Sequence, residues 1–164
     1  MPRNFKSTAN LQKPDPKFGS MLATKIINKL MQGGKKTTAQ KIFYSALELA
    51  ESKVENLEGE TQLERQEALF NQAIDNIRPA VEVRSKRVGG ANYQVPREVK
   101  RSRQQALAIR WFVDNARKKK GKPMHIRLSE EMVDAFNGTG ASVTWKENVH
   151  KMAEANKAYA HFAR

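Results

Sequence analysis

One stretch of the chain, residues 80–96, limits its possible folds more than any other. It reads AVEVRSKRVGGANYQVP, so two runs rich in β-branched residues meet at Gly89 and Gly90. A Gly-Gly pair tolerates the positive φ angles that a two-residue turn requires, and such runs on either side of it are typical of a β-hairpin. The stretch therefore predicts two antiparallel strands joined by a tight turn.

The two predicted strands lack a continuous apolar face. With this turn Lys86 lies opposite Tyr93 and Arg84 lies opposite Val95, while Arg87 is on the other side of the ribbon. Two strands of this kind rarely hold together in water without a core or a partner, so we expect the hairpin to project rather than pack. A projecting ribbon with Arg, Lys, Tyr, Asn and Gln side chains fits a nucleic-acid groove, because it offers phosphate donors, base-edge donors and a stacking ring.

The charge is unevenly distributed along the sequence. The 164 residues contain 30 Lys and Arg against 17 Asp and Glu, a formal net charge of +13. The excess lies in residues 1–19, 78–103 and 117–127, and the last of these segments contains six basic residues and no acidic one. A body near neutrality with concentrated basic blocks is typical of a protein that binds a polyanion.

The composition excludes several classes of protein. The sequence contains no Cys, which rules out disulfide scaffolds, zinc–thiolate sites and thiol nucleophiles and suits a reducing compartment. The longest apolar stretch near the amino end, residues 21–31, is interrupted by Lys25, Asn28 and Lys29 and lacks the layout of a secretory signal. No carboxylate cluster for a metal and no nucleophile–base pair can be identified. We therefore expect a cytoplasmic protein without membrane contact, cofactor or enzyme activity.

The rest of the sequence has helical periodicity. Thr61 and Glu64 form the signature of a capping box, and we expect Thr37 or Thr38, and Ser102, to cap two other helices. The predicted helices cover residues 20–31, about 38–53 and 61–78 before the hairpin, and residues 102–116, 124–136 and about 142–161 after it. The predicted fold class is mainly α: a six-helix bundle with a protruding two-stranded β-hairpin arm between the third and fourth helices.

The amino end differs from this pattern. Residues 1–18 contain Pro2, Pro14 and Pro16 with four basic residues, and such a segment cannot bury enough apolar surface to order itself. We expect a basic, largely extended tail over residues 1–18 and a single helical domain over residues 19–164, with the arm at about 80–97.

Two stretches are more specific than any periodicity. They are RPAVEVRSKRVGGANYQVP at residues 78–96 and HKMAEANKAYAH at residues 150–161. Both resemble small-subunit ribosomal protein seven of the bacterial type, and residues 14–20, 34–37 and 107–111 add to the resemblance, which covers nearly the whole chain in order. The sequence departs from the family at residues 144–146, Thr-Trp-Lys, where the family normally has a more basic run, and in a longer, more acidic loop at residues 55–66.

The resemblance implies a structural constituent of the small ribosomal subunit. It implies a primary contact with the 3′ major domain of small-subunit rRNA, nucleation of head assembly, and a place beside the exit-site tRNA and the mRNA. Neighbouring ribosomal proteins of the head and platform are further implied partners.

The basic blocks and the resemblance together define the candidate contact residues. Those expected to bind RNA are Arg3, Lys6, Lys17, Lys35, Lys36, Arg78, Arg84, Lys86, Arg87, Tyr93, Arg97, Lys100, Arg101, Arg103, Arg110, Arg117, Lys118 and Lys119. Those that the resemblance places near tRNA or mRNA are Arg84, Lys86, Arg87, His150, Lys151 and Lys157.

Other interpretations stay open at this point. A DNA-bending architectural protein also combines a helical body with a basic ribbon, although it usually needs an apolar wedge at the ribbon tip, and Val88-Gly-Gly-Ala91 is a poor one. A charged hairpin can also serve only to prevent edge-to-edge pairing. Trp111, Trp145 and Tyr159 could stack on bases, but aromatic residues at helical spacing are more often core, clearly so for Trp111.

Overall fold

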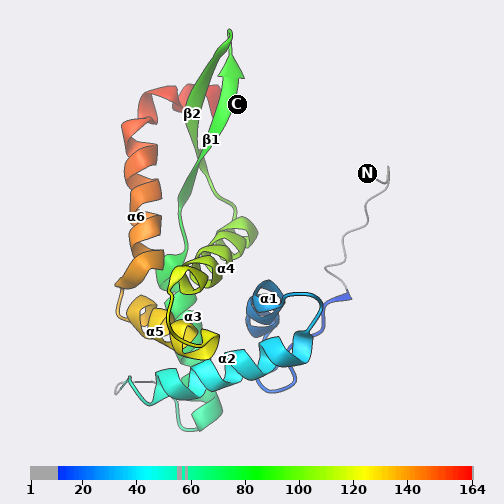
Figure 1. The fold of residues 1–164 in the computed structure, drawn as a ribbon. Helices are drawn as coiled ribbons and strands as arrows, with labels where there is room; N and C mark the ends of the chain where they lie inside the picture. The colour runs from blue at the N-terminus through cyan, green and yellow to red at the C-terminus, as the bar shows by residue number, and fades with distance from the viewer. Residues whose placement is uncertain (1–10, 55–56, 58, 164) are drawn as a thin grey trace.

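The computed structural model describes residues 11–54, 57 and 59–163, and Figure 1 shows a helical body from which a β-ribbon rises. In chain order the elements are α1 (Met21–Leu30), α2 (Lys36–Glu51), α3 (Gln62–Ile77), β1 (Val81–Val88), β2 (Ala91–Glu98), α4 (Arg101–Lys118), α5 (Met124–Phe136), α6 (Gly140–Ala155) and the 3-10 helix η2 (Lys157–Ala163). The predicted mainly α fold, with its hairpin between the third and fourth helices, is confirmed. Among the helices that the structure describes, none is long and apolar enough to span a membrane.

The core of the body is formed by one face of each helix. Phe43 of α2, Phe70 of α3 and Phe112 of α4 are almost completely buried, and the rings of Phe43 and Phe70 meet edge to face at 5.9 Å between centroids. Leu128 and Met132 of α5 are fully buried, because α5 packs against α2, α3, α4 and α6. Burial of such side chains stabilises a fold by about 1.5–3 kcal/mol each. These contacts therefore hold the helices in fixed orientations relative to one another.

The ribbon has the predicted register. Val88 pairs with Ala91, Lys86 with Tyr93, and Arg84 with Val95 across the antiparallel strands. Gly89 and Gly90 have φ angles of 57° and 88°. A two-residue turn with both central φ angles positive matches the twist of the strands, so the Gly-Gly pair determines the register.

The ribbon projects from the body as predicted, but the expectation that it does not pack is wrong. The strands rise above the body, but α6 runs beside them and η2 crosses β2, as Figure 1 shows. The ring of Tyr93 lies 5.1 Å from that of Tyr159 and 5.4 Å from that of Phe162, centroid to centroid. Val95, on the same strand, is only 1% exposed. The isolated ribbon would be marginally stable, and these contacts supply the partner that it needs.

The sixth helix ends earlier than predicted, at Ala155 rather than near His161. The side-chain amide of Asn156 donates a hydrogen bond to the carbonyl oxygen of Met152, at 2.8 Å. Asn side chains compete with the helical backbone pattern in this way and favour helix ends. The chain then turns into η2 and reaches the ribbon, which is why periodicity alone placed residues 157–161 on the wrong element.

The helix starts are partly as predicted. The capping box at α3 is confirmed, because Thr61 Oγ1 accepts a hydrogen bond from Glu64 N, and Glu64 Oε2 accepts one from Thr61 N. The predicted caps of the second and fourth helices are wrong. The N-cap residues are Lys35 and Lys100, and neither makes a side-chain capping bond. Each helix starts earlier than predicted, so the hydroxyl residues assigned as caps lie within the first turn.

The described part of the predicted tail contacts the body. Asp15 is 3% exposed, and the hydroxyl of Tyr44 donates a hydrogen bond to its Oδ1 at 2.8 Å. Thr24 Oγ1 donates to the carbonyl oxygen of Lys13 at 3.0 Å, and the ring of Phe18 packs edge to face on Phe70. Residues 13–18 are thus joined to the helices, where the sequence had predicted an extended tail. A buried carboxylate with several donors accounts for this order.

Candidate nucleic-acid interface

Two helices carry cations at the end where the helix dipole is positive. The N-cap and first residue of α2 are Lys35 and Lys36, and those of α4 are Lys100 and Arg101. Neither helix has an acidic residue in its first turn. A cation at this end opposes the dipole by about 0.3–1 kcal/mol, whereas an anion there is stabilised. The arrangement is unfavourable for the isolated protein and favourable for a bound phosphate.

These two helix starts lie on the same side of the body. In Figure 1, α2 and α4 both begin on the side where α1 lies. A hydrogen bond connects α1 to α4 on this side: Lys25 Nζ donates to Gln105 Oε1 at 2.6 Å. Lys35, Lys36, Lys100 and Arg101 are exposed, and in the described part of the chain none of the four side chains makes an ion pair. Two basic segments that are more than sixty residues apart in the sequence thus begin helices on the side of the body where α1 lies.

A cationic hollow of about 300 Å³ lies at the foot of the ribbon, next to the start of α4. Its lining includes four cations, Arg84, Arg97, Lys100 and Arg103, and two carboxylates, Glu82 and Glu98. Glu82 holds two of these cations in place: it accepts from Arg84 Nε at 2.6 Å and lies 3.3 Å from a terminal nitrogen of Arg103. These partly exposed pairs contribute little to stability, but they hold the side chains of Arg84 and Arg103 in the lining of the hollow.

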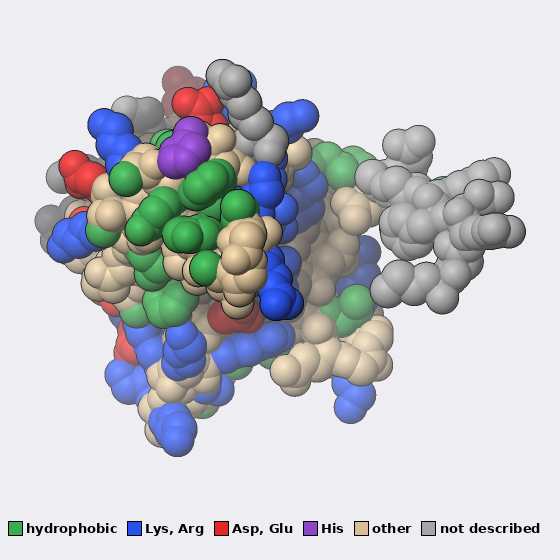
Figure 2. All heavy atoms as spheres, turned by 90° about the horizontal axis from the view of Figure 1, so that it is seen from above, with side chains coloured by type: hydrophobic (Ala, Val, Ile, Leu, Met, Phe, Trp, Pro, Cys, Tyr) green, Lys and Arg blue, Asp and Glu red, His purple; other side chains and the backbone are tan. Residues whose placement is uncertain are grey.

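The upper ribbon combines cations with an aromatic cluster. Arg87, beside the turn, is exposed. Lys86 Nζ donates a hydrogen bond to the carbonyl oxygen of Phe162 at 2.7 Å, and Tyr93 packs on Tyr159 and Phe162. Figure 2, which looks down on this end, shows Lys and Arg side chains bordering a patch of hydrophobic ones. Tyr93 is therefore part of an internal cluster rather than a fully exposed stacking ring.

The third basic block is used largely within the protein. Arg117 donates two hydrogen bonds to the carbonyl oxygens of Lys29 and Leu30, at 3.2 and 3.1 Å, and so caps the C-terminal end of α1. Cations are favourable at that end of a helix. The sequence predicts an RNA contact for Arg117 because six basic residues cluster at residues 117–127, and it gives no sign of the contact with α1, which is distant along the chain.

Lys119 of the same block is the partner of a buried acid. Its Nζ lies 3.0 Å from Oε2 of Glu131, whose side chain is 0% exposed, and 3.3 Å from Oδ2 of Asp134. Burial alone would lower the pKa of Lys119, but the hydrogen bonds and charges of Glu131 and Asp134 outweigh it and raise the pKa above its usual value. Lys119 is thus held charged by neighbours inside the protein.

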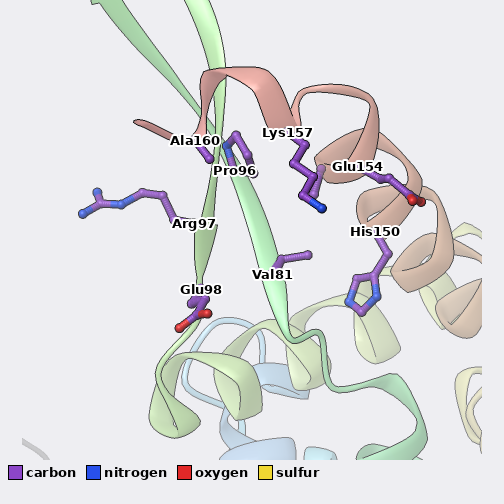
Figure 3. Close-up of a pocket in the computed structure, with 9 residues that line it drawn as sticks. Val81, Pro96, Arg97, Glu98, His150, Glu154, Lys157 and Ala160 are labelled. Carbon is purple, nitrogen blue, oxygen red and sulfur yellow. The ribbon is translucent and has the colours of Figure 1, made fainter. Parts of the chain in front are cut away.

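A second hollow, of about 480 Å³, separates the ribbon from α6 and η2 (Figure 3). Val81 and Pro96 form its ribbon side, and the side chain of Lys157 points into it from η2. His150 lies at its lower end, where its Nε2 accepts a hydrogen bond from the backbone N–H of Ala80 at 3.2 Å. The structure thus brings His150 and Lys157 to one hollow beside the ribbon.

The remaining predicted residues lie apart from these features. Arg78 pairs with Asp75 at 3.0 Å, and Lys17 lies 3.9 Å from Glu48. Arg110 and Lys151 are exposed on α4 and α6. Arg3 and Lys6 lie outside the described residues.

Sequence reasoning missed a buried polar group that joins α5 to α6. Glu131 Oε1 accepts hydrogen bonds from the backbone N–H and the hydroxyl of Ser142, at 2.9 and 2.6 Å. A signal was present, because Glu131 follows Leu128 by three residues and precedes Ala135 by four, which places it on the apolar face of its helix. Across residues 11–54, 57 and 59–163 no group of three or more His, Asp or Glu side chains could hold a metal ion.

Comparison with known proteins gives a consistent result. The family model described as "Ribosomal protein S7p/S5e" matches residues 2–157. The chain is 49% identical over 160 residues to small ribosomal subunit protein uS7 of Fervidobacterium nodosum, covering 98% of each chain. It is 55% identical over 150 residues to uS7 of Petrotoga mobilis, covering 91% of each, and 51% identical over 162 residues to uS7 of Eikenella corrodens, covering 99% of each. Each of these names describes a protein of the small ribosomal subunit.

Proposed function

The chain belongs to the ribosomal protein S7p/S5e family, and we propose that it binds the 3′ major domain of small-subunit rRNA and nucleates assembly of the subunit head. The family consists of structural ribosomal proteins and not of enzymes. In this proposal residues 1–18 are a basic segment that contacts RNA, and residues 19–164 form the rRNA-binding domain. Affinity comes largely from Lys and Arg that neutralise phosphates, and fit comes from the shape of the RNA.

One observation carries the rRNA contact: the exposed cations at the starts of α2 and α4. Lys35, Lys36, Lys100 and Arg101 stand at positive helix ends without acidic neighbours in the first turn. Removing these cations would relieve an unfavourable interaction in the free protein, so their presence is best accounted for by an anionic partner. Arg97 and Arg103 extend the same surface to the foot of the ribbon.

We propose that the ribbon and α6 form the surface that contacts exit-site tRNA and mRNA. Arg84, Lys86 and Arg87 follow one another along β1, and His150, Lys151 and Lys157 belong to α6 and η2 beside the ribbon. Support comes from the hollow between β2 and α6, which gathers His150 and Lys157. Neighbouring ribosomal proteins of the head and platform are proposed to contact the exposed side of the aromatic cluster, where Tyr159 is 37% exposed. In this proposal the protein is located in the cytoplasm as part of the ribosome.

The third basic block has a divided role. Arg117 and Lys119 make intramolecular contacts, so we assign them to the stability of the body. Lys118, at the end of α4, is exposed and makes no ion pair with the described residues, so it keeps its assignment to RNA. Among the other predicted cations, Arg110 is exposed and keeps its assignment to RNA.

The DNA-bending alternative is not favoured by any feature of the ribbon. Its tip consists of Gly89 and Gly90, flanked by Val88 and Ala91. Proteins that kink duplex DNA insert a large apolar side chain between base steps, and this tip offers none.

A charge-replacement experiment tests the rRNA contact. The variant Arg97→Gln, Arg101→Gln should bind a 3′ major-domain rRNA fragment more weakly than the parent. It should also reduce the slope of log affinity against log salt by up to about 1.8, at roughly 0.9 per phosphate contact and less for single strands. The matched control, Lys41→Gln with Lys53→Gln, removes two exposed cations outside the proposed surface and should keep the parent slope. Equal slopes for the two variants, or displacement of the RNA by duplex DNA at equal nucleotide concentration, would refute the proposal.

A further inference from the structure

Trp145 of α6 is unusually exposed for a tryptophan. Its side chain is 46% exposed. The other exposed large aromatic of the described residues, Tyr159, packs on Tyr93 and lies parallel to Phe162. Trp145 contacts no other aromatic ring in the described part of the chain. An exposed indole of this kind is typical of a contact surface, since aromatic rings carry much of the binding energy at interfaces.

A cation is held over this ring. Lys118 Nζ lies 5.0 Å from the centroid of the Trp145 ring and donates a hydrogen bond to Asn115 Oδ1 at 3.1 Å. Asn115 is itself buried, and its Nδ2 donates to Ser142 Oγ at 3.3 Å. The ammonium group is therefore positioned by a buried network rather than by chance contact. Because it lies over one face of the indole, a flat ligand would use the exposed remainder of the ring.

Lys118, the cation over the Trp145 ring, makes no ion pair in the described part of the chain. The positions that neighbour Trp145 on its side of α6 are Ala141, Ser142, Asn148 and Val149, none of which is acidic. Lys120 is exposed close to Lys118 in the sequence and makes no ion pair with the described residues. The nearest acids of α5 in this network, Glu131 and Asp134, are already paired with Lys119. A flat apolar surface beside uncompensated cations matches a nucleotide, which has a flat base and a negative phosphate.

We infer that Trp145 and Lys118 form a binding site for one unpaired nucleotide of RNA. The base stacks on the exposed part of the indole, and its phosphate lies near the ammonium groups of Lys118 and Lys120. The inference rests on the proposed rRNA binding and adds a stacking contact to a surface otherwise formed by cations. Single-stranded and looped RNA is suited to such a contact, because its bases are free to leave the helix and stack on aromatic side chains.

Affinity and salt dependence separate the two parts of the site. Trp145→Ala should weaken binding of the 3′ major-domain rRNA fragment by about 5- to 150-fold, the range for loss of one stacked base. The salt slope should not change, because no charge is removed. Lys118→Met should instead reduce the slope by about 0.7–0.9. Trp145→Phe, which keeps a ring, should retain most of the affinity, and Met152→Ala, a change at another exposed apolar residue of α6, should bind like the parent.

Tryptophan emission gives an independent measurement. The chain has two Trp residues, so the emission of the variant Trp111→Phe comes from Trp145 alone. If Trp111→Phe does not fold, the emission of the parent minus that of Trp145→Phe gives the same signal. RNA should quench this emission, as stacking on a base does. Parent-like affinity of Trp145→Ala together with unchanged emission overturns the inference and leaves the proposed function intact. Emission that changes only in subunits containing other proteins assigns Trp145 to a protein partner and also overturns it. Absence of RNA binding by the parent overturns both proposals.

Discussion

Tyr44 donates a hydrogen bond through its hydroxyl to Oδ1 of Asp15, at 2.8 Å, and so joins α2 to a segment that precedes α1. The other oxygen of the same carboxylate accepts hydrogen bonds from the backbone N–H groups of Lys17 and Phe18. Burial, followed by the hydrogen bond and the charge of Asp15, raises the pKa of Tyr44 to about 12. Residues 13–18 are therefore ordered by a polar contact in a segment with no helical periodicity.

Replacement of Tyr44 tests this contact. Tyr44→Phe removes one hydrogen bond to a buried carboxylate, so the free energy of unfolding at neutral pH should fall by about 2 kcal/mol. Urea unfolding measures the change. Tyr159→Phe, at an exposed hydroxyl for which no hydrogen bond is formed in the described chain, is the control and should stay within about 0.5 kcal/mol of the parent.

The same contact predicts a dependence on pH. Between pH 10 and about 12 the folded protein keeps the phenol proton of Tyr44, whereas the unfolded chain releases it. The stabilisation from this group is therefore complete below about pH 10 and is lost as the pH rises toward 12. The difference in unfolding free energy between the parent and Tyr44→Phe should narrow as the pH rises from about 10 to about 12. A constant difference would show that the phenol titrates normally.

Loss of the buried ion pair should be costly. Lys119→Met leaves the buried carboxylate of Glu131 without its cation, and breaking such a pair typically destabilises a protein by about 3–5 kcal/mol; the partial exposure of Lys119 favours the lower value. Lys120→Met removes the adjacent exposed cation and should change the free energy of unfolding by less than about 0.5 kcal/mol. Similar unfolding midpoints for the two variants would contradict an internal role for Lys119.

The C-terminal segment should stabilise the ribbon more than the body. Removal of residues 157–164 takes away the rings of Tyr159 and Phe162 that cover Tyr93. Because two isolated strands are marginally stable, amide hydrogen exchange in residues 81–98 should become several-fold faster, whereas exchange in α3 should not change. Unaltered exchange in the ribbon would mean that α6 alone supports it.

Replacement of Thr61 and replacement of Thr37 should have different effects on stability, although both residues resemble helix caps in the sequence. Thr61→Ala removes a hydrogen bond at the start of α3 and should destabilise the protein by about 1 kcal/mol. Thr37 lies inside the first turn of α2 and makes no side-chain capping bond, so Thr37→Ala should change stability by less than about 0.5 kcal/mol. Thermal unfolding of both variants compares them directly, and equal losses would contradict the observed start of α2.

Local chemistry explains which predictions succeeded. The Gly89-Gly90 turn and the pairing of Lys86 with Tyr93 follow from neighbouring residues, and so does the capping box of Thr61 and Glu64. The number and order of the helices also follow, because an apolar side recurs every three to four residues. The basic blocks could also be located from the sequence, because counting Lys and Arg along the chain does not require knowledge of the fold.

The sequence by itself therefore determined the six α-helices and two strands, their order, the ribbon register and the positions of the basic blocks, but not η2. Only the tertiary structure decided which cations face outward and which are paired inside. Lys119 and Lys120 are adjacent in the sequence, yet one neutralises buried Glu131 and the other is exposed. The cover of Tyr93 by Tyr159 and Phe162, and the position of Lys118 over Trp145, were likewise decided by packing. Such contacts join residues that are distant along the chain, and their energies depend on burial, which exists only once the helices have packed together.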